Sequence, residues 1–309
     1  MKLFCGIDWA EAHHDVAIVD ENGHLIAKKR ITDDPTGFAE LSELLTAVGD
    51  SADEPVPVAI ETPRGLLVAS LRATGRPVYS INPLAVARYR ERHSVARAKS
   101  DHADAMTLAN ILRVDAHLHR RLPADTELCQ AIAVLARAHQ DAIWRRTKAH
   151  NELRSLLREF FPTFLATFVS RFPLGIASPE ARAVLAIGPT PAAAAKLSVT
   201  RIAAALRRAG RSRNIEQAAA AIKPDLRKPQ LRQPVLVENA MGVQVLALLA
   251  ALDTACSSVE DLSRAAAESF QQHPDYAIIT SFPAWPTRPA LACSPRSATT
   301  AHGSPTREH

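Results

Sequence analysis

The start of the chain constrains the fold more than any other stretch. Residues 3–9 form a short apolar run of strand length that carries one carboxylate, Asp8, near its end. A second run covers residues 14–20, and Asn22-Gly23 then supplies the positive-φ residues of a tight hairpin turn. These two runs and the run that follows the turn, 24–27, are therefore predicted to pair as antiparallel neighbours. Because a carboxylate on a buried central strand is costly unless it is paired, Asp8 requires a cation, a donor or a proton from another part of the chain.

After this hairpin, strand patterns and helix patterns alternate. We expect strands at 25–31, 57–61 and 77–81, and helices at 36–48, 65–74, 83–92 and 101–114. Three strands joined by turns, followed by alternating helix and strand, is the ribonuclease-H-like order. The predicted fold class is therefore α/β, with a mixed sheet and helices on its faces.

A long helix is predicted between residues 128 and 160. Apolar residues recur there about every 3.5 positions, as in a coiled coil, and no proline interrupts before Pro162. His139 and Arg146 occupy seam positions and weaken the pattern. The helix could pack on its own domain or pair with a second copy. We expect at least a dimer through it, which Leu135→Glu together with Leu153→Glu should separate into monomers.

The composition divides the chain into four parts. We expect a first domain over residues 1–123, the long coiled-coil-like helix over 124–170, a helical region over 171–283 and a disordered tail over 284–309. The tail has four prolines, seven Ser or Thr and a single Leu, so it cannot bury a core. Its abrupt change of composition suggests a shifted reading frame.

Charge, cysteine content and hydropathy narrow the class of protein. A net charge of +5 is compatible with a polyanionic partner. The cysteines are too far apart for a zinc site or a disulfide framework, which favours reduced thiols. They are Cys5, Cys129, Cys256 and Cys293. No signal peptide is expected, and the most apolar later stretch, 235–252, contains Glu238 and Asn239. We therefore expect a soluble cytoplasmic protein without a membrane span.

Two further acids stand at the start of the helix predicted for 101–114. If Ser100 caps that helix, Asp101 and Asp104 lie three residues apart on one face. Alone they are equally explained as favourable partners of the helix dipole. Together with Asp8 and Glu61, each near a strand end, they predict a cluster of carboxylates that could ionise only around a cation. Oxygen ligands suit Mg²⁺, and paired metal ions suit phosphodiester chemistry.

A basic cluster precedes these acids. It consists of Arg88, Arg90, Arg92, Arg97 and Lys99. Such a run is usually a solvated face, but beside a phosphodiester site we expect it to bind the nucleic-acid backbone. His13, His14 and His102 have no matching ligand set, so surface or packing roles are expected for them.

At these positions the sequence resembles the DEDD-type insertion-sequence transposases, a RuvC-like group that includes the pilin-inverting recombinase. The resemblance covers about residues 3–283. The matching stretches are Gly6-Ile7-Asp8-Trp9-Ala10, Ile60-Glu61, Asn82-Pro83, Lys99-Ser100-Asp101-His102-Ala103-Asp104-Ala105, the long helix, Pro189-Thr190-Pro191, His273-Pro274-Asp275 and Thr280-Ser281-Phe282-Pro283.

This resemblance implies a RuvC-like domain in which Asp8, Glu61, Asp101 and Asp104 bind metal. It implies DNA as substrate, Mg²⁺ as cofactor, an oligomeric state and direction by a structured guide RNA. In the family a second domain with a Gly-Leu-Gly hairpin and a nucleophilic serine follows the Ser-Phe-Pro stretch, whereas here the sequence runs into the tail. The role of that serine is assigned to none of Ser294, Ser297 and Ser304. We therefore expect a truncated transposase or site-specific recombinase that binds nucleic acid without completing recombination.

Other classes of protein remain open. A stand-alone nuclease or junction resolvase would need only the carboxylates, and a non-catalytic nucleic-acid-binding dimer would need none of them. Actin-like kinases and ATPases also begin with an acid-bearing strand and a hairpin. They need Gly-rich phosphate loops, which a chain with 11 scattered glycines does not supply.

Overall fold

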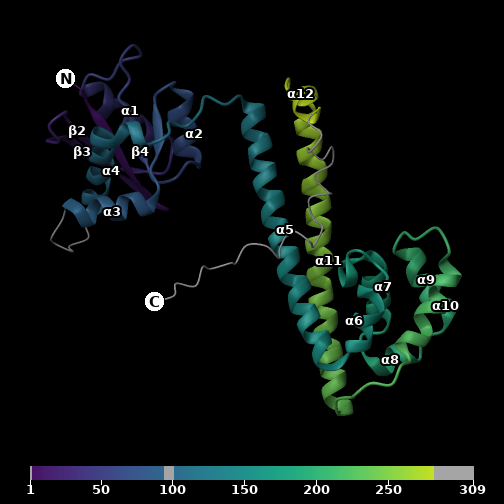
Figure 1. Cartoon of the computed structure of the whole chain (residues 1–309). Coiled ribbons are helices and arrows are strands. Elements are labelled where there is room, and N and C mark those ends of the chain that lie inside the picture. The colour runs from purple at the N-terminus through teal and green to yellow at the C-terminus, as the bar shows by residue number, and fades with distance from the viewer. Residues whose placement is uncertain (1, 94–100, 282–309) are drawn as a thin grey trace, which may run out of the picture. The chain divides into compact units, whose positions relative to one another are not determined.

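The computed structural model describes the backbone of residues 2–93 and 101–281, and the side chains of these residues except 93 and 101–103. The chain divides into two compact units, Met1–Ala124 and Asp125–His309 (Figure 1). The tail that we expected to be disordered, 284–309, lies outside the described residues.

The first unit is built around a mixed five-stranded sheet with the order β3-β2-β1-β4-β5. The neighbours β3, β2 and β1 run antiparallel, whereas β1, β4 and β5 run parallel. The strands are β1 (Phe4–Trp9), β2 (His13–Val19), β3 (Leu25–Thr32), β4 (Val58–Ile60) and β5 (Val78–Ser80). This arrangement confirms the predicted α/β class and the predicted hairpin.

Helices α1 (Pro35–Ala47) and α2 (Leu66–Ala73) cover one face of the sheet. Their apolar side chains form one core with Cys5 and Ile7 of β1 and with Val58 and Ile60 of β4. The start of α1 is fixed locally, because the carboxylate of Asp34 accepts a hydrogen bond from the Gly37 amide at 2.8 Å. This bond to the ionised form lowers the pKa of Asp34.

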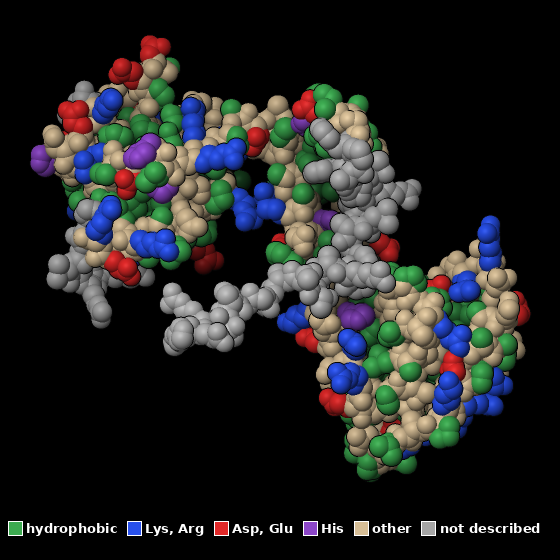
Figure 2. Space-filling model, in the orientation of Figure 1, with side chains coloured by type: hydrophobic (Ala, Val, Ile, Leu, Met, Phe, Trp, Pro, Cys, Tyr) green, Lys and Arg blue, Asp and Glu red, His purple; other side chains and the backbone are tan. Residues whose placement is uncertain are grey.

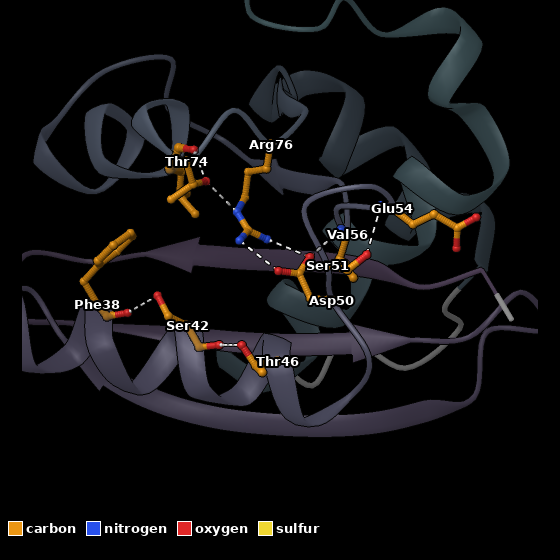
Figure 3. Close-up of polar contacts among 10 residues, drawn as sticks. Phe38, Ser42, Thr46, Asp50, Ser51, Glu54, Val56, Thr74 and Arg76 are labelled. Atoms are coloured by element: carbon orange, nitrogen blue, oxygen red, sulfur yellow. Dashed lines mark hydrogen bonds and ion pairs between the residues drawn. The ribbon is translucent and has the colours of Figure 1, made fainter.

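The loop that leads into β4 is held by a buried ion pair (Figure 3). The carboxylate of Asp50 accepts hydrogen bonds from both terminal nitrogens of Arg76, at 3.2 and 3.0 Å, and one from the Val56 amide at 2.7 Å. Asp50 follows α1, and Arg76 stands just before β5. The pair therefore ties together the connections on either side of β4.

The opposite face of the sheet carries α4 (Asp101–Asp115), with α3 (Pro83–His93) packed beside it. A glycine permits this close packing. A Cβ atom on Gly6 would lie 2.0 Å from the Ala105 carbonyl oxygen and 2.5 Å from the Ala109 nitrogen. Late in α4, a terminal nitrogen of Arg113 donates to the Glu21 carbonyl oxygen at 3.2 Å, beside the β2–β3 turn. The start of α4 therefore lies towards the opposite end of the sheet, where β1 ends.

The second unit is a helical hairpin that carries a lobe of shorter helices. The long helices are α5 (Glu127–Phe160) and α11 (Val235–Gln271), and the long helix predicted between residues 128 and 160 is thereby confirmed as α5. They run antiparallel, because the Cys129 sulfur near the start of α5 lies 3.2 Å from Nε2 of His273, just past α11. The lobe contains α6 (Pro162–Val169), α7 (Pro179–Ile187), α8 (Pro191–Ala195), α9 (Val199–Arg208) and α10 (Ile215–Leu226), and α12 (Tyr276–Thr280) follows α11.

The apolar seam of α5 is covered within the same chain. Leu153 and Leu157 are fully buried in a core that α11 and the lobe share. Phenylalanine rings extend this core into α6, where Phe164 stacks on Phe168 with ring centroids 4.5 Å apart. Of the two seam arrangements considered above, packing within the chain is the one observed for this half of α5. The Leu135 half of the helix is only partly buried, and dimerisation through α5 stays a prediction.

Helix α11 is more apolar than the sequence analysis assumed. It is 37 residues long, and its most apolar window has a mean hydropathy of 1.9 with 28% of that window buried. By length and composition alone it could cross a membrane. This is a weak indication, since a core helix of a soluble protein passes the same test, and α11 packs along α5 (Figure 1).

The thiols behave as small buried side chains. Cys5 and Cys256 are buried, and Cys129 is partly buried, all three as free cysteines. Burial raises the pKa of the Cys5 thiol to about 12 and also raises that of Cys256. Both thiols are therefore protonated and unreactive at neutral pH.

Candidate functional site

A row of charged residues crosses the sheet at the C-terminal end of β1. The register pairs Asp8 with Asp15 on β2, and Asp15 with Arg30 on β3. On the other side Ile7 pairs with Ile60 of β4, so that Glu61, the residue after β4, takes the position next to Asp8. Parallel neighbours end at the same edge of a sheet, which is why two distant parts of the sequence bring their carboxylates together here.

The acids of this row lie on the face that α4 covers. Side chains alternate between the faces of a strand, and Gly6, two residues before Asp8, is the residue on which α4 packs. Ala59, two residues before Glu61, belongs to the same α4-side core. The predicted partners Asp8 and Glu61 therefore share one end and one face of the sheet.

Asp15 is an acid that our sequence analysis did not select. It is 3% exposed, and Arg30 binds both of its carboxylate oxygens, at 3.1 and 2.8 Å. Such a bidentate pair compensates for burial of the charge. A signal was present in the sequence, because pairing the predicted runs 3–9 and 14–20 from their adjoining ends sets Asp15 opposite Asp8.

Asp104 sits in the first turn of α4, at the end of the sheet where β1 ends. It is 8% exposed, and its Oδ1 lies 2.8 Å from a terminal nitrogen of Arg90 on α3. A predicted metal ligand and a predicted phosphate-binding residue thus contact each other. The side chain of Asp101 and the whole of Arg97 and Lys99 lie outside the described part of the chain.

The candidate ligands whose side chains are described match a divalent cation in their chemistry but are not gathered around a common point. Carboxylate oxygens from Asp8, Glu61 and Asp104 are the ligand type that Mg²⁺ prefers, and all three lie towards one end of the sheet. Among the side chains that the structure describes, no three His, Cys, Asp or Glu are gathered closely enough to hold a metal ion. The donors therefore fit in chemistry, while Asp104 is held by Arg90 and Asp101 belongs to the undescribed side chains.

His14 has a packing role, as predicted. It is fully buried, its Nδ1 accepts a hydrogen bond from the Ala10 amide at 3.4 Å, and its ring stacks on Trp9 at 6.4 Å. Its Nε2 lies 3.2 Å from Oδ1 of Asp33, in ion-pair range but without hydrogen-bond alignment. These contacts fix the end of β1 beside Asp8.

The basic residues of α3 border an open groove. The groove has a volume of about 530 Å³, and Arg88, Tyr89 and Arg92 line it together with the C-terminal end of α4. The guanidinium of Arg92 lies 5.8 Å from the Tyr89 ring centre and 3.8 Å from the Asp115 carboxylate. In the second unit, Lys and Arg side chains are spread over the lobe around α9 and α10 (Figure 2). Both surfaces suit a polyanion.

Comparison with known proteins gives a consistent result. A family model described as a transposase, for DEDD transposases of the IS110 type, matches residues 5–162. The chain is 53% identical over 283 residues to a protein named as the mini-circle transposase for IS117 of Streptomyces coelicolor, covering 92% of this chain and 68% of that protein. It is 31% identical over 163 residues to the transposase y4uE of Sinorhizobium fredii, covering 52% of this chain and 45% of that protein.

A protein of insertion element IS110 from Streptomyces coelicolor is 27% identical over 165 residues, which cover 39% of its length. The chain thus spans about two thirds of the IS117 relative and less than half of the other two. The family match and the IS117 match agree with the family suggested by the residues around Asp8 and Asp104. The chain belongs to the IS110 family of DEDD transposases.

Proposed function

We propose that the first unit of this transposase carries a metal-dependent site for DNA strand chemistry, with Asp8, Glu61, Asp101 and Asp104 as the ligands. The observation that carries the proposal is the meeting of two strand ends and a helix start. Asp8 and Glu61 end adjacent parallel strands on one face, and Asp104 opens the helix that lies on that face.

The strand order supports a ribonuclease-H-like, RuvC-like fold for this unit. The sequence predicts three strands joined by turns and then alternating helix and strand, and the sheet has the order β3-β2-β1-β4-β5, with β1 antiparallel to β2 and parallel to β4. In such a sheet the central strand has covered faces and a paired edge on both sides. An acid at its end is therefore held rigidly, which suits a site that must keep its ligands in place.

Bound Mg²⁺ would supply activation of an attacking oxygen and stabilisation of a leaving oxygen in phosphodiester transfer. The chain's own groups bind and orient the nucleic acid. Arg88 and Arg92 would contact backbone phosphates along the groove of α3, and Arg97 and Lys99 would extend this contact. Asp15, paired with Arg30, would hold the hairpin beside Asp8.

DNA is the partner that the family implies, and we further propose a structured guide RNA and at least a dimer. The RNA proposal is supported by exposed basic residues on the lobe of the second unit, among them Arg201, Arg208 and Arg213. The dimer proposal is supported by exposed apolar side chains on α5, since Val134 is 57% and Trp144 is 64% exposed. We also propose a cytoplasmic location and the four-part domain division given above.

The site assignment is tested by calorimetric titration of Mg²⁺. Asp8→Asn and Asp104→Asn should each weaken Mg²⁺ binding by about tenfold or more while leaving the circular dichroism spectrum unchanged, because each removes one charged oxygen ligand. Asp53→Asn is the matched control, since this acid is exposed in the loop before β4. Equal affinities for wild type, both site variants and the control would refute the assignment.

A further inference from the structure

The contact between Arg90 and Asp104 has a consequence for metal binding. A terminal nitrogen of Arg90 lies 2.8 Å from Oδ1 of Asp104, and the Asp104 side chain is 12% exposed. A magnesium ligand needs an oxygen lone pair directed at the ion from about 2.0–2.1 Å. A guanidinium on the same carboxylate competes for the lone pairs and repels a divalent cation. Arg90 and a bound metal ion therefore compete for the Asp104 carboxylate.

Arg90 has an incomplete set of partners in this position. Its Nε is buried and has no hydrogen-bond partner among the described residues. A buried donor without a partner weakens the arrangement that produces it. The side chain is nevertheless 38% exposed, so that an incoming anion can reach it. A phosphate offers the paired oxygens that suit the guanidinium fork and can satisfy donors that a single aspartate oxygen leaves free.

The geometry of α3 separates Arg90 from its basic neighbours. Arg88 and Arg92 are four residues apart, share one side of the helix and line the groove. Arg90 lies two residues from each and instead contacts Asp104. The neighbours add positive potential to this helix, which attracts a phosphate backbone towards it.

We propose that Arg90 is a positioning residue that keeps Asp104 from a divalent cation until a nucleic-acid phosphate takes its guanidinium. This inference rests on the proposed function, because it assumes that Asp104 is a metal ligand. Metal and nucleic acid then bind cooperatively, and each raises the affinity for the other by the same factor. The protein without nucleic acid binds metal weakly. Its metal site gains Asp104 as a ligand only when the nucleic acid is bound.

The test uses the full chain without nucleic acid and Mn²⁺ as the probe, with free Mn²⁺ followed by electron paramagnetic resonance. Arg90→Gln should bind Mn²⁺ about tenfold more tightly than wild type, because the opposing charge is gone. Arg90→Lys retains a charge near Asp104 and should stay within about threefold of wild type. Lys29→Gln is the control for loss of one positive charge, because Lys29 pairs with Glu40 on the surface of the same unit. The double variant Arg90→Gln/Asp104→Asn should not show this increase in Mn²⁺ affinity.

Different outcomes separate this inference from the site assignment. If Arg90→Gln binds Mn²⁺ as wild type does while Asp8→Asn loses binding, the role of Arg90 is refuted and the metal site stands. If neither wild type nor Arg90→Gln binds Mn²⁺, both proposals fail. Arg90→Ala repeats the measurement should Arg90→Gln lose its helical circular dichroism signal. If the increase in Mn²⁺ affinity persists in the double variant, the effect of Arg90 does not act through Asp104, and its proposed role is also refuted.

Discussion

Replacing Gly6 by Ala tests how the candidate site is assembled. The added methyl group would lie 2.0 Å from the Ala105 carbonyl oxygen, about 1.4 Å inside the ordinary contact limit of 3.4 Å. A second backbone atom, the Ala109 nitrogen, would be 2.5 Å away. Neither atom can turn aside as a side chain could, so α4 must move away from β1. Overpacking of this kind typically destabilises a domain by about 1–3 kcal/mol, and we expect the upper part of this range.

The displacement of α4 should affect the site beyond the loss of stability. Asp104 precedes Ala105 in α4, and Asp8 lies two residues after Gly6 in β1. A shift of about 1 Å between two ligands is enough to reduce activity by about 100-fold in a preorganised site. Gly6→Ala should therefore weaken Mn²⁺ binding by about tenfold or more at a temperature where the first unit is still folded.

The measurement combines urea unfolding of the full chain with Mn²⁺ titration below the unfolding transition. Gly242→Ala is the matched control, because its Cβ would meet Cγ2 of Thr190 at 2.5 Å in the second unit, far along the chain from the site. The control should lose stability without losing metal affinity. If Gly6→Ala binds Mn²⁺ with wild-type affinity, then contact between α4 and β1 does not position the ligands, and the reasoning is wrong.

Two further predictions concern the second unit. Burial, and then the charge of a nearby arginine, lower the pKa values of His139 and His150 below the ordinary value of 6.5, so the unfolded chain takes up protons first as pH falls. Urea unfolding of this unit should therefore show stability that declines as pH falls through about 6.5, the ordinary pKa of histidine. Replacing both histidines by Gln should flatten the decline, and a decline of the same size in that variant would contradict the prediction. Leu153→Glu should destabilise the unit by about 3–5 kcal/mol and not simply yield folded monomers, because Leu153 is fully buried in the chain's own core. Leu135→Glu, at a partly buried position, is the milder comparison, and a folded Leu153→Glu monomer by light scattering and circular dichroism would refute the contrast.

The elements of this protein could be predicted because local signals and burial agree. The helix predicted at 128–160 is α5 (Glu127–Phe160), and the strand predicted at 25–31 is β3 (Leu25–Thr32). Caps account for the small differences, since the Thr126 side chain accepts a hydrogen bond from the Cys129 amide and starts α5. Where a pattern is strongly periodic and its ends carry caps or prolines, sequence reasoning is reliable to within a residue or two.

The partners of these elements could not be predicted in the same way. The period of α5 reports that one face is buried, but the same apolar stripe suits a second copy or a distant helix of the same chain. The structure supplies α11 as the partner, from more than 70 positions later in the sequence. Likewise the charge of Arg30 carries no signal for Asp15, because their pairing depends on the register of β2 with β3.

The candidate site shows most clearly what sequence reasoning misses. Residue type, together with position at a strand end or a helix start, was enough to select Asp8, Glu61 and Asp104, and this selection stays a prediction. The cations that balance Asp104 and the neighbouring Asp15 come from other elements. Arg30 neutralises Asp15 from an outer strand, and Arg90 reaches Asp104 from the preceding helix. A buried carboxylate without a bound metal ion needs such a partner, because burying an unpaired charge is costly. The acids of such a site have two kinds of partner: arginines, which balance their charge in the folded protein, and the proposed metal ion, which serves the reaction. Substrate binding can control the site by replacing the first kind of partner with the second.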